Sequence, residues 1–235
     1  MQLDRCDNGH LDERLKNKNQ VGDWLYAGGQ PDLWDRGYLV RREDVDCGNI
    51  DEAEKTNCNS FCFATIAPHH KEFQHTKWGD IENCIISKSK SRNKKFSIFI
   101  LPIFSENDRE YCGYQKPIGC GIKIPAGFWK VGFYIGIDDN LHSVAFKIMQ
   151  DYYWIDNLKE ESQSSTKYHW LERMDVVTKY QVPLITINAV TGIIFDEHLY
   201  EMNPPRYHTN INTKRANIVT PKAHIIRKKT DLILE

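Results

Sequence analysis

Residues 35–42 read Asp35-Arg36-Gly37-Tyr38-Leu39-Val40-Arg41-Arg42, and Glu43-Asp44-Val45 follows directly. The aliphatic pair in the second half of this stretch predicts a short β-strand over Leu39–Arg42. Successive side chains of an extended strand alternate between its two faces, so Arg41 and Arg42 would point to opposite sides. The stretch therefore predicts that at most one of these two arginines faces a given ligand.

Apolar runs elsewhere in the chain predict a domain of mixed secondary structure. Strands are expected where aliphatic and aromatic residues cluster, at Ser60–Ile66, Phe96–Leu101, Phe128–Ile137, Val144–Met149 and Val182–Ile187. Helices are expected at Lys77–Ser89, where apolar residues recur every three or four positions, and at Lys167–Tyr180. Because strands and helices do not alternate regularly, the pattern favours an α+β fold over a doubly wound one.

The composition is that of an ordinary globular domain. Hydrophobic residues make up 40% of the 235 residues and charged residues 27%, which excludes a disordered, collagen-like or coiled-coil chain. The 31 basic and 32 acidic residues give a net charge of −1. Because no overall positive field exists to attract a polyanion, any contact with nucleic acid must be local.

Neither a membrane span nor a secretory signal is expected from the sequence. No stretch approaches the roughly 18 consecutive apolar residues that a spanning helix needs. Met1–Gln20 is polar and has no apolar central segment. The sequence therefore favours an intracellular location, or a protein from which a leader has been removed.

The cysteines form no recognisable set of ligands or bridges. Their number is odd and no two of them form a CxxC pair; they are Cys6, Cys47, Cys58, Cys62, Cys84, Cys112 and Cys120. Neither a zinc ribbon nor a disulfide scaffold fits this spacing. We therefore expect reduced, partly buried thiols.

The C-terminal residues differ in charge from the rest of the chain. Asn203–Glu235 contains seven basic and two acidic residues, which gives 7 − 2 = +5. Such a segment is either a solvated extension or a grip for phosphates or an acidic partner. We predict one domain over residues 1–202 and a basic extension over residues 203–235.

Five motifs occur in order along the chain. They are Asp35-Arg36-Gly37-Tyr38; Asn57–His69; Phe73-Gln74 with Trp78-Gly79-Asp80-Ile81-Glu82; Ile124–Lys130; and Tyr180-Gln181-Val182 with Thr191-Gly192. In order and spacing they resemble the motifs D-R-G-H, A-N-x-D-T-F-H-F-T-N-x-A-P-Q, F-N … W-x-x-L-E, I-P-x-x-F-W-K and Y-Q-V … T-G-L of the DNA/RNA non-specific endonucleases, a family that includes endonuclease G. The resemblance covers roughly residues 20–200.

This resemblance implies a fold and a site. The fold would be a mixed, largely antiparallel central sheet with flanking helices and a ββα-metal finger, shortened at its N-terminus because the family places further strands ahead of Gln20. In the family, the histidine of D-R-G-H is the general base, and the asparagine of F-N holds a divalent ion, usually Mg²⁺. Here those two positions are Tyr38 and Gln74.

Other positions of the implied site are partly retained. Thr65 and His69 stand where the family has a second asparagine and a glutamine, and would line the substrate site. Glu82, which the resemblance assigns to metal-bound water, is present, as are the arginines at 36, 41 and 42. Structural roles are the alternatives: a solvated Glu82, and an Asp35–Arg36 pair that holds the loop.

The two central replacements weaken the expected chemistry. The reference pKa of histidine, near 6.5, suits a base at neutral pH, whereas that of a phenol is about 10. Tyr38 is therefore expected to be a poor base, and a packed aromatic residue with a hydrogen-bonded hydroxyl rather than a nucleophile. Gln74 offers a suitable oxygen for Mg²⁺ on a side chain one methylene longer than asparagine. His69, His70 and His75 are either recruited as a base or metal ligands, or are exposed loop histidines.

Two function classes remain open from the sequence. One is a non-catalytic or impaired protein that binds nucleic acid through its arginines or serves as a structural subunit of a larger assembly with a protein partner. The other is an active metal-dependent endonuclease that hydrolyses phosphodiester bonds in DNA and RNA, with Arg36 and Glu82 in the catalytic site. An antitoxin-like or scaffold role is a third possibility.

Overall fold

The computed structural model describes residues 6, 8–16, 20–26, 34–45, 48–93, 95–106, 108, 110–111, 122–150, 179–202 and 224–225. The chain divides into two compact units, Met1–Glu82 with Phe104–Ala126, and Asn83–Ile103 with Gly127–Glu235. In chain order the elements are η2 (Asp23–Leu25), β1 (Trp34–Tyr38), η3 (Arg42–Asp44), α1 (Ile50–Asn59), η4 (Phe63–Thr65), β2 (Ile66–His70), η5 (Phe73–Trp78), α2 (Gly79–Arg92), β3 (Ser97–Ile103), β4 (Glu110–Tyr111), β5 (Ile122–Lys123), β6 (Gly127–Ile135), β7 (Leu141–Met149), β8 (Lys179–Val182), α4 (Leu184–Thr191), α5 (Glu197–Glu201) and β9 (His224–Ile225).

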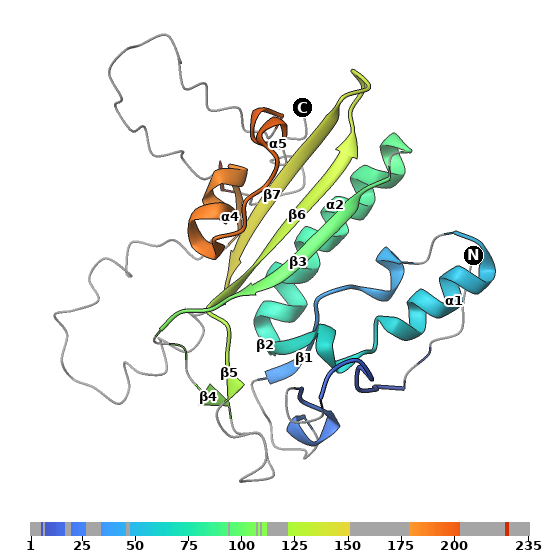
Figure 1. Cartoon of the computed structure of the whole chain (residues 1–235), viewed down its shortest axis with the longest axis vertical. Helices are drawn as coiled ribbons and strands as arrows, with labels where there is room; N and C mark the ends of the chain where they lie inside the picture. Colours follow the sequence, from blue (N-terminus) through green and yellow to red (C-terminus); the bar gives the residue numbers. More distant parts are fainter. Residues whose placement is uncertain are drawn as a thin grey trace, which may run out of the picture. The chain divides into compact units, whose positions relative to one another are not determined.

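A ββα arrangement organises the first unit. Strands β1 and β2 pair antiparallel, with Gly37 opposite Ala67 and Asp35 opposite His69. The chain then passes through η5, a six-residue π-helix, into the start of α2 (Figure 1). The helix expected at Lys77–Ser89 is thus confirmed, with its start preceded by a π-helix and its end extended to Arg92.

Two expected strands of this unit are displaced. The strand predicted at Leu39–Arg42 is wrong, because β1 ends at Tyr38 and a 3-10 turn begins at Arg42. The strand predicted at Ser60–Ile66 is also wrong, since the N–H groups of Phe61 and Cys62 bond back to the end of α1 rather than to a neighbouring strand. Burial alone does not fix the backbone here: Phe61 is 4% exposed without being in a strand.

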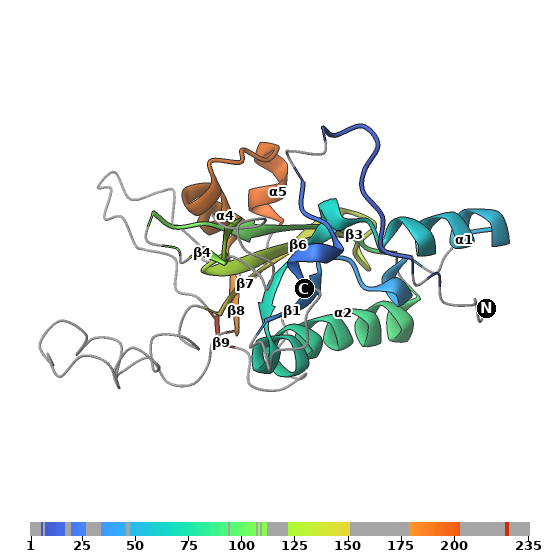
Figure 2. The ribbon, with the colours of Figure 1, turned by 90° about the horizontal axis from the view of Figure 1, so that it is seen from below.

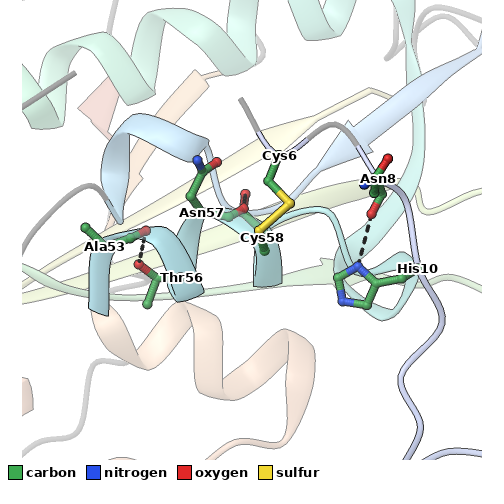
Figure 3. Close-up of a disulfide and its surroundings, with 8 residues drawn as sticks. Cys6, Asn8, His10, Ala53, Thr56, Asn57 and Cys58 are labelled. Carbon is green, nitrogen blue, oxygen red and sulfur yellow. Dashed lines mark hydrogen bonds between the residues drawn. A yellow bond between two sulfur atoms is a disulfide. The ribbon is translucent and has the colours of Figure 1, made fainter. Parts of the chain in front are cut away.

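A disulfide corrects the expectation of reduced cysteines. Cys6 and Cys58 are joined, with their Cα atoms 5.1 Å apart (Figure 3). Helix α1 carries Cys58 in its last turn and begins with a capping box between Asn49 and Glu52. Among the described cysteines, Cys62 and Cys84 do not form a disulfide.

The second unit is built on an antiparallel sheet with strand order β3-β6-β7-β8-β9. The strands predicted at Phe96–Leu101, Phe128–Ile137 and Val144–Met149 are confirmed as β3, β6 and β7, with shifted ends. The β6–β7 hairpin turns at Asp138–Asn140, with Asp139 in the left-handed region at φ 59°. The fold is thus α+β with largely antiparallel pairing, as predicted.

Helices cover both faces of this sheet. The part of α2 beyond Glu82 lies along one face, and α4 and α5 lie on the other (Figures 1 and 2). Buried residues beneath α4 and α5 form one core cluster: Ile103, Trp129, Val131, Ala145, Val182, Leu184 and Ile187. The backbone N–H of Ser143 donates to the carbonyl of Met202 at 3.2 Å, and its hydroxyl to that of Leu199 at 2.9 Å, which fixes α5 on β7.

The last predicted strand, Val182–Ile187, is wrong beyond its first residue. Strand β8 ends at Val182, and Pro183 is the N-cap of α4. Because proline has no N–H to donate, it cannot continue the sheet ladder. Gly192, at φ 73°, is the C-cap of this helix, so the Thr191-Gly192 motif marks the end of α4.

Several expectations fall outside the described residues. These are most of the helix predicted at Lys167–Tyr180, whose last two residues instead begin β8, and most of the basic segment after Asn203, of which His224–Ile225 pairs with β8. Within the described part of the chain, no helix is long and apolar enough to cross a membrane.

Candidate functional site

A cavity of about 280 Å³ lies in the first unit. Its lining residues come from the end of β1, the following 3-10 turn, the end of α1, the π-helix and the start of α2: Tyr38, Val40, Arg41, Arg42, Glu43, Ser60, Phe61, Gln74 and Glu82. Five residues singled out from the sequence therefore share one cavity. Val40, Glu43, Ser60 and Phe61 were not expected at the site, although all four lie in the stretches that the sequence analysis singled out.

Tyr38 is a packed wall residue of this cavity. Its half-buried ring lies edge to face against Phe61, with ring centroids 5.4 Å apart. The expected hydrogen bond of its hydroxyl is not found among the described residues. Tyr38 thus presents a phenol to the cavity without a described protein partner.

Arg41 and Arg42 differ in their ion pairs. Arg41 is paired with Glu43 at 3.1 Å and with Asp44 at 3.6 Å. Arg42 makes no ion pair within the described residues. The expectation that Arg41 and Arg42 face opposite sides is wrong, because the chain leaves the extended conformation at Arg42 and both line the cavity.

Gln74 and Glu82 reach the cavity from successive helical segments. Gln74 lies in the π-helix, a form that occurs often at functional sites. Glu82 lies in the first turn of α2, which continues directly from the π-helix. It is only 5% exposed, so the alternative of a solvated Glu82 is wrong.

His69 lies behind the cavity rather than in it. The side chain is fully buried, and its Nδ1 contacts Oε1 of Gln74. A substrate-lining role for His69 therefore disagrees with its burial. Its cross-strand partner is Asp35, but its ring extends toward Gly37, where a Cβ atom would lie 2.1 Å from the imidazole Cγ.

Two further predicted residues are engaged elsewhere. Arg36 pairs with Asp23, and Thr65 donates its hydroxyl to the carbonyl of Cys62 at 2.8 Å; neither residue is among those lining the cavity. The suggested Asp35–Arg36 pair is also replaced, since Asp35 lies 3.3 Å from Nε2 of His75.

The other histidines of the motif do not line the cavity either. His70 is buried in β2, with the Trp34 ring edge-on to its own, and burial lowers the pKa of its imidazole. The alternative of three exposed loop histidines is thus wrong for His69 and His70, while the His75 side chain is 73% exposed. As a result, no histidine is among the described residues that line the cavity.

The donors available to a divalent ion are few. Gln74 and Glu82 bring an amide and a carboxylate oxygen to one cavity, and both are hard ligands of the type that Mg²⁺ prefers. No group of three or more His, Cys, Asp and Glu side chains that could hold a metal occurs in the described part of the chain. The two oxygens fit an ion that keeps most of its water ligands.

The ββα arrangement and this cavity define a class of protein. A family model for the DNA/RNA non-specific endonucleases matches residues 5–202, and the chain belongs to that family. The fold is similar to that of a solved structure, the EndoG/EndoGI complex, with a TM-score of 0.54 and 17% identity over 82% of this chain and 70% of that one.

A particular relative comes from Sinorhizobium fredii (strain NBRC 101917 / NGR234). It is the uncharacterized protein y4fB, which is 30% identical over 197 residues. The match covers 80% of this chain and 27% of y4fB, so the chain spans about a quarter of the length of that relative.

Proposed function

We propose that this chain binds nucleic acid at the cavity and that its hydrolysis of phosphodiester bonds is impaired. The observation that carries the proposal is the position of Tyr38, which lines one cavity together with Gln74 and Glu82. Tyr38 stands at the position where the family motif has its histidine. A general base typically raises the rate of such a reaction by a factor of about 10² to 10⁴. A phenol is protonated at neutral pH, so it cannot take over this task.

Binding is assigned mainly to Arg42. Arg42 lines the cavity and has no ion pair among the described residues, whereas Arg41 is paired with Glu43 and Asp44. A free guanidinium can donate two parallel hydrogen bonds to a phosphate. Because the net charge of the chain is −1, this affinity depends on local contacts and falls as salt rises.

Gln74 and Glu82 would hold Mg²⁺ if the site takes an ion. The ion would stabilise charge on the phosphate, as it does in metal-assisted hydrolysis generally. The other residues of the cavity would bind the phosphate. Arg42 orients it, Phe61 holds the Tyr38 ring, and the Tyr38 hydroxyl donates a hydrogen bond to it. None of these groups takes a proton from water.

An active metal-dependent endonuclease is the second candidate. It is favoured by the common placement of Gln74, Glu82 and Arg42 around one cavity. This candidate requires solvent hydroxide, or a carboxylate of the cavity, in place of the lost base. Its signature would be cleavage that increases with pH and requires the divalent ion.

The proposal is tested by measuring binding apart from cleavage. Fluorescence anisotropy with a labelled DNA or RNA oligonucleotide in EDTA reports binding alone. We expect Arg42→Gln to weaken binding about tenfold, whereas Arg14→Gln, which removes an exposed arginine paired with Asp12, leaves it unchanged. Wild-type protein that does not bind either oligonucleotide, or equal binding by wild type and Arg42→Gln, contradicts this assignment.

A further inference from the structure

The contact between His69 and Gln74 joins strand β2 to the π-helix. Nδ1 of His69 contacts Oε1 of Gln74. Gln74 lines the cavity, while His69 is fully buried and is absent from its lining. Among the described contacts, the histidine reaches the cavity lining through the glutamine.

The imidazole of His69 is closely surrounded by Phe73, Trp78 and Gly37. It packs in T-shaped geometry against the rings of Phe73 and Trp78, at centroid distances of 5.2 and 5.0 Å. Both aromatic residues are fully buried. The absence of a Cβ at Gly37 also provides space that the ring occupies. A ring enclosed in this way fixes the position of its Nδ1.

We infer that His69 is a positioning residue, which fixes the amide of Gln74 and thereby sets the affinity of the cavity for a divalent cation. The inference rests on the proposed function, because it assigns the ion to Gln74 and Glu82. A neutral histidine with its proton on Nδ1 donates to the Gln74 oxygen, and a carbonyl oxygen keeps a second lone pair for a cation.

The chemistry explains why a longer ligand needs such a partner. A glutamine has one more rotatable bond than the asparagine of the family motif, so ordering its amide costs more conformational entropy. A buried donor that holds the amide in advance removes most of this cost from cation binding. Residues that orient a metal ligand in this way typically change metal affinity by about 10- to 100-fold.

The test is a titration of Mn²⁺ followed by electron paramagnetic resonance, which measures binding without any catalytic step. We expect His69→Phe, which keeps an aromatic ring but lacks the donor, to weaken Mn²⁺ binding at least about tenfold. His69→Asn places an amide nitrogen near the position of Nδ1 and is expected to bind within about threefold of wild type. The matched control is His75→Phe, an exposed histidine of the same π-helix, which should not change the affinity.

A double-mutant cycle separates positioning from direct ligation and from general loosening. In a Gln74→Ala background, His69→Phe should have no further effect on Mn²⁺ binding. Unchanged Mn²⁺ binding by folded His69→Phe, an undiminished effect in the Gln74→Ala background, or no Mn²⁺ binding by wild type each overturns the inference. If His69→Phe does not fold, His69→Asn decides, because the inference requires it to retain binding. Nucleic-acid cleavage by wild type would instead refute impaired hydrolysis and leave this inference standing.

Discussion

The imidazole of His69 fills the space that a side chain on Gly37 would need in the β1–β2 pair. A Cβ on Gly37 would lie 2.1 Å from Cγ of the His69 imidazole and 2.5 Å from the carbonyl oxygen of Ala67. No side chain and imidazole can coexist at these distances. The glycine of the D-R-G motif is thus explained here by a close approach rather than by backbone conformation.

Gly37→Ala is therefore expected to lower the free energy of unfolding by roughly 3 kcal/mol, because the ring and the backbone oxygen must both move. Urea denaturation measures this loss. Gly79→Ala is the control for loss of a glycine, since the nearest neighbour of its Cβ would be a backbone oxygen at 3.6 Å, and it should raise the free energy of unfolding by up to about 1 kcal/mol because alanine is the better helix former. Equal stabilities of the two variants would show that His69 does not occupy this space.

His70 predicts a decrease in stability in mild acid. Burial lowers the pKa of its imidazole from the usual value of 6.5, so the folded state binds fewer protons than the unfolded state between the two pKa values. The contribution of His70 to the free energy of unfolding is therefore complete above about pH 6.5 and is lost as the pH falls below that value. Urea denaturation at several pH values should show a shallower dependence for His70→Gln than for wild type. Identical slopes would rule out this contribution.

The disulfide predicts sensitivity to reductant. Cys6 and Cys58 are 52 positions apart, and closing a loop of that size stabilises a fold by about 4 kcal/mol in the chain-entropy model. Dithiothreitol should lower the melting temperature of wild type and of Cys62→Ser, and should leave Cys58→Ser unaffected. Mass spectrometry that finds Cys6 and Cys58 reduced, with a melting temperature that does not respond to reductant, would contradict this account.

Much of the fold could be predicted from the sequence because its patterns are local. The apolar spacing at Trp78 and Ile81 gave the start of α2, and the continuous apolar run from Phe96 gave β3. The errors occurred where residues are buried without being in a strand. Phe61 is buried in a turn, and Pro183 ends a strand and begins a helix within one apolar run.

The sequence predicted which residues form the site better than it predicted the contacts between them. The motifs named Tyr38, Arg41, Arg42, Gln74 and Glu82, which share a cavity. They did not indicate that His69 lies beneath Gln74, because that contact depends on the sheet register and on the π-helix. The Cys6–Cys58 pairing was equally inaccessible, since spacing does not encode connectivity.

Restoring the family residues should restore some cleavage. Tyr38→His supplies a base, while Gln74→Asn and Thr65→Asn recreate the family's polar groups at the two other positions. The reversion as a whole should raise the rate of plasmid digestion in Mg²⁺ by about 10² or more over wild type, with Tyr38→His contributing most. A triple variant that folds and stays inert would show that the base position is assigned wrongly.

The most direct test of the account is the digestion of plasmid DNA and of RNA by the wild-type chain in Mg²⁺ and in Mn²⁺, at neutral pH, beside a buffer control. Because a phenol replaces the imidazole at position 38 and no histidine lines the described cavity, we predict no digestion above the control. Robust digestion by wild type, lost on addition of EDTA, would contradict impaired hydrolysis and establish the chain as an active endonuclease.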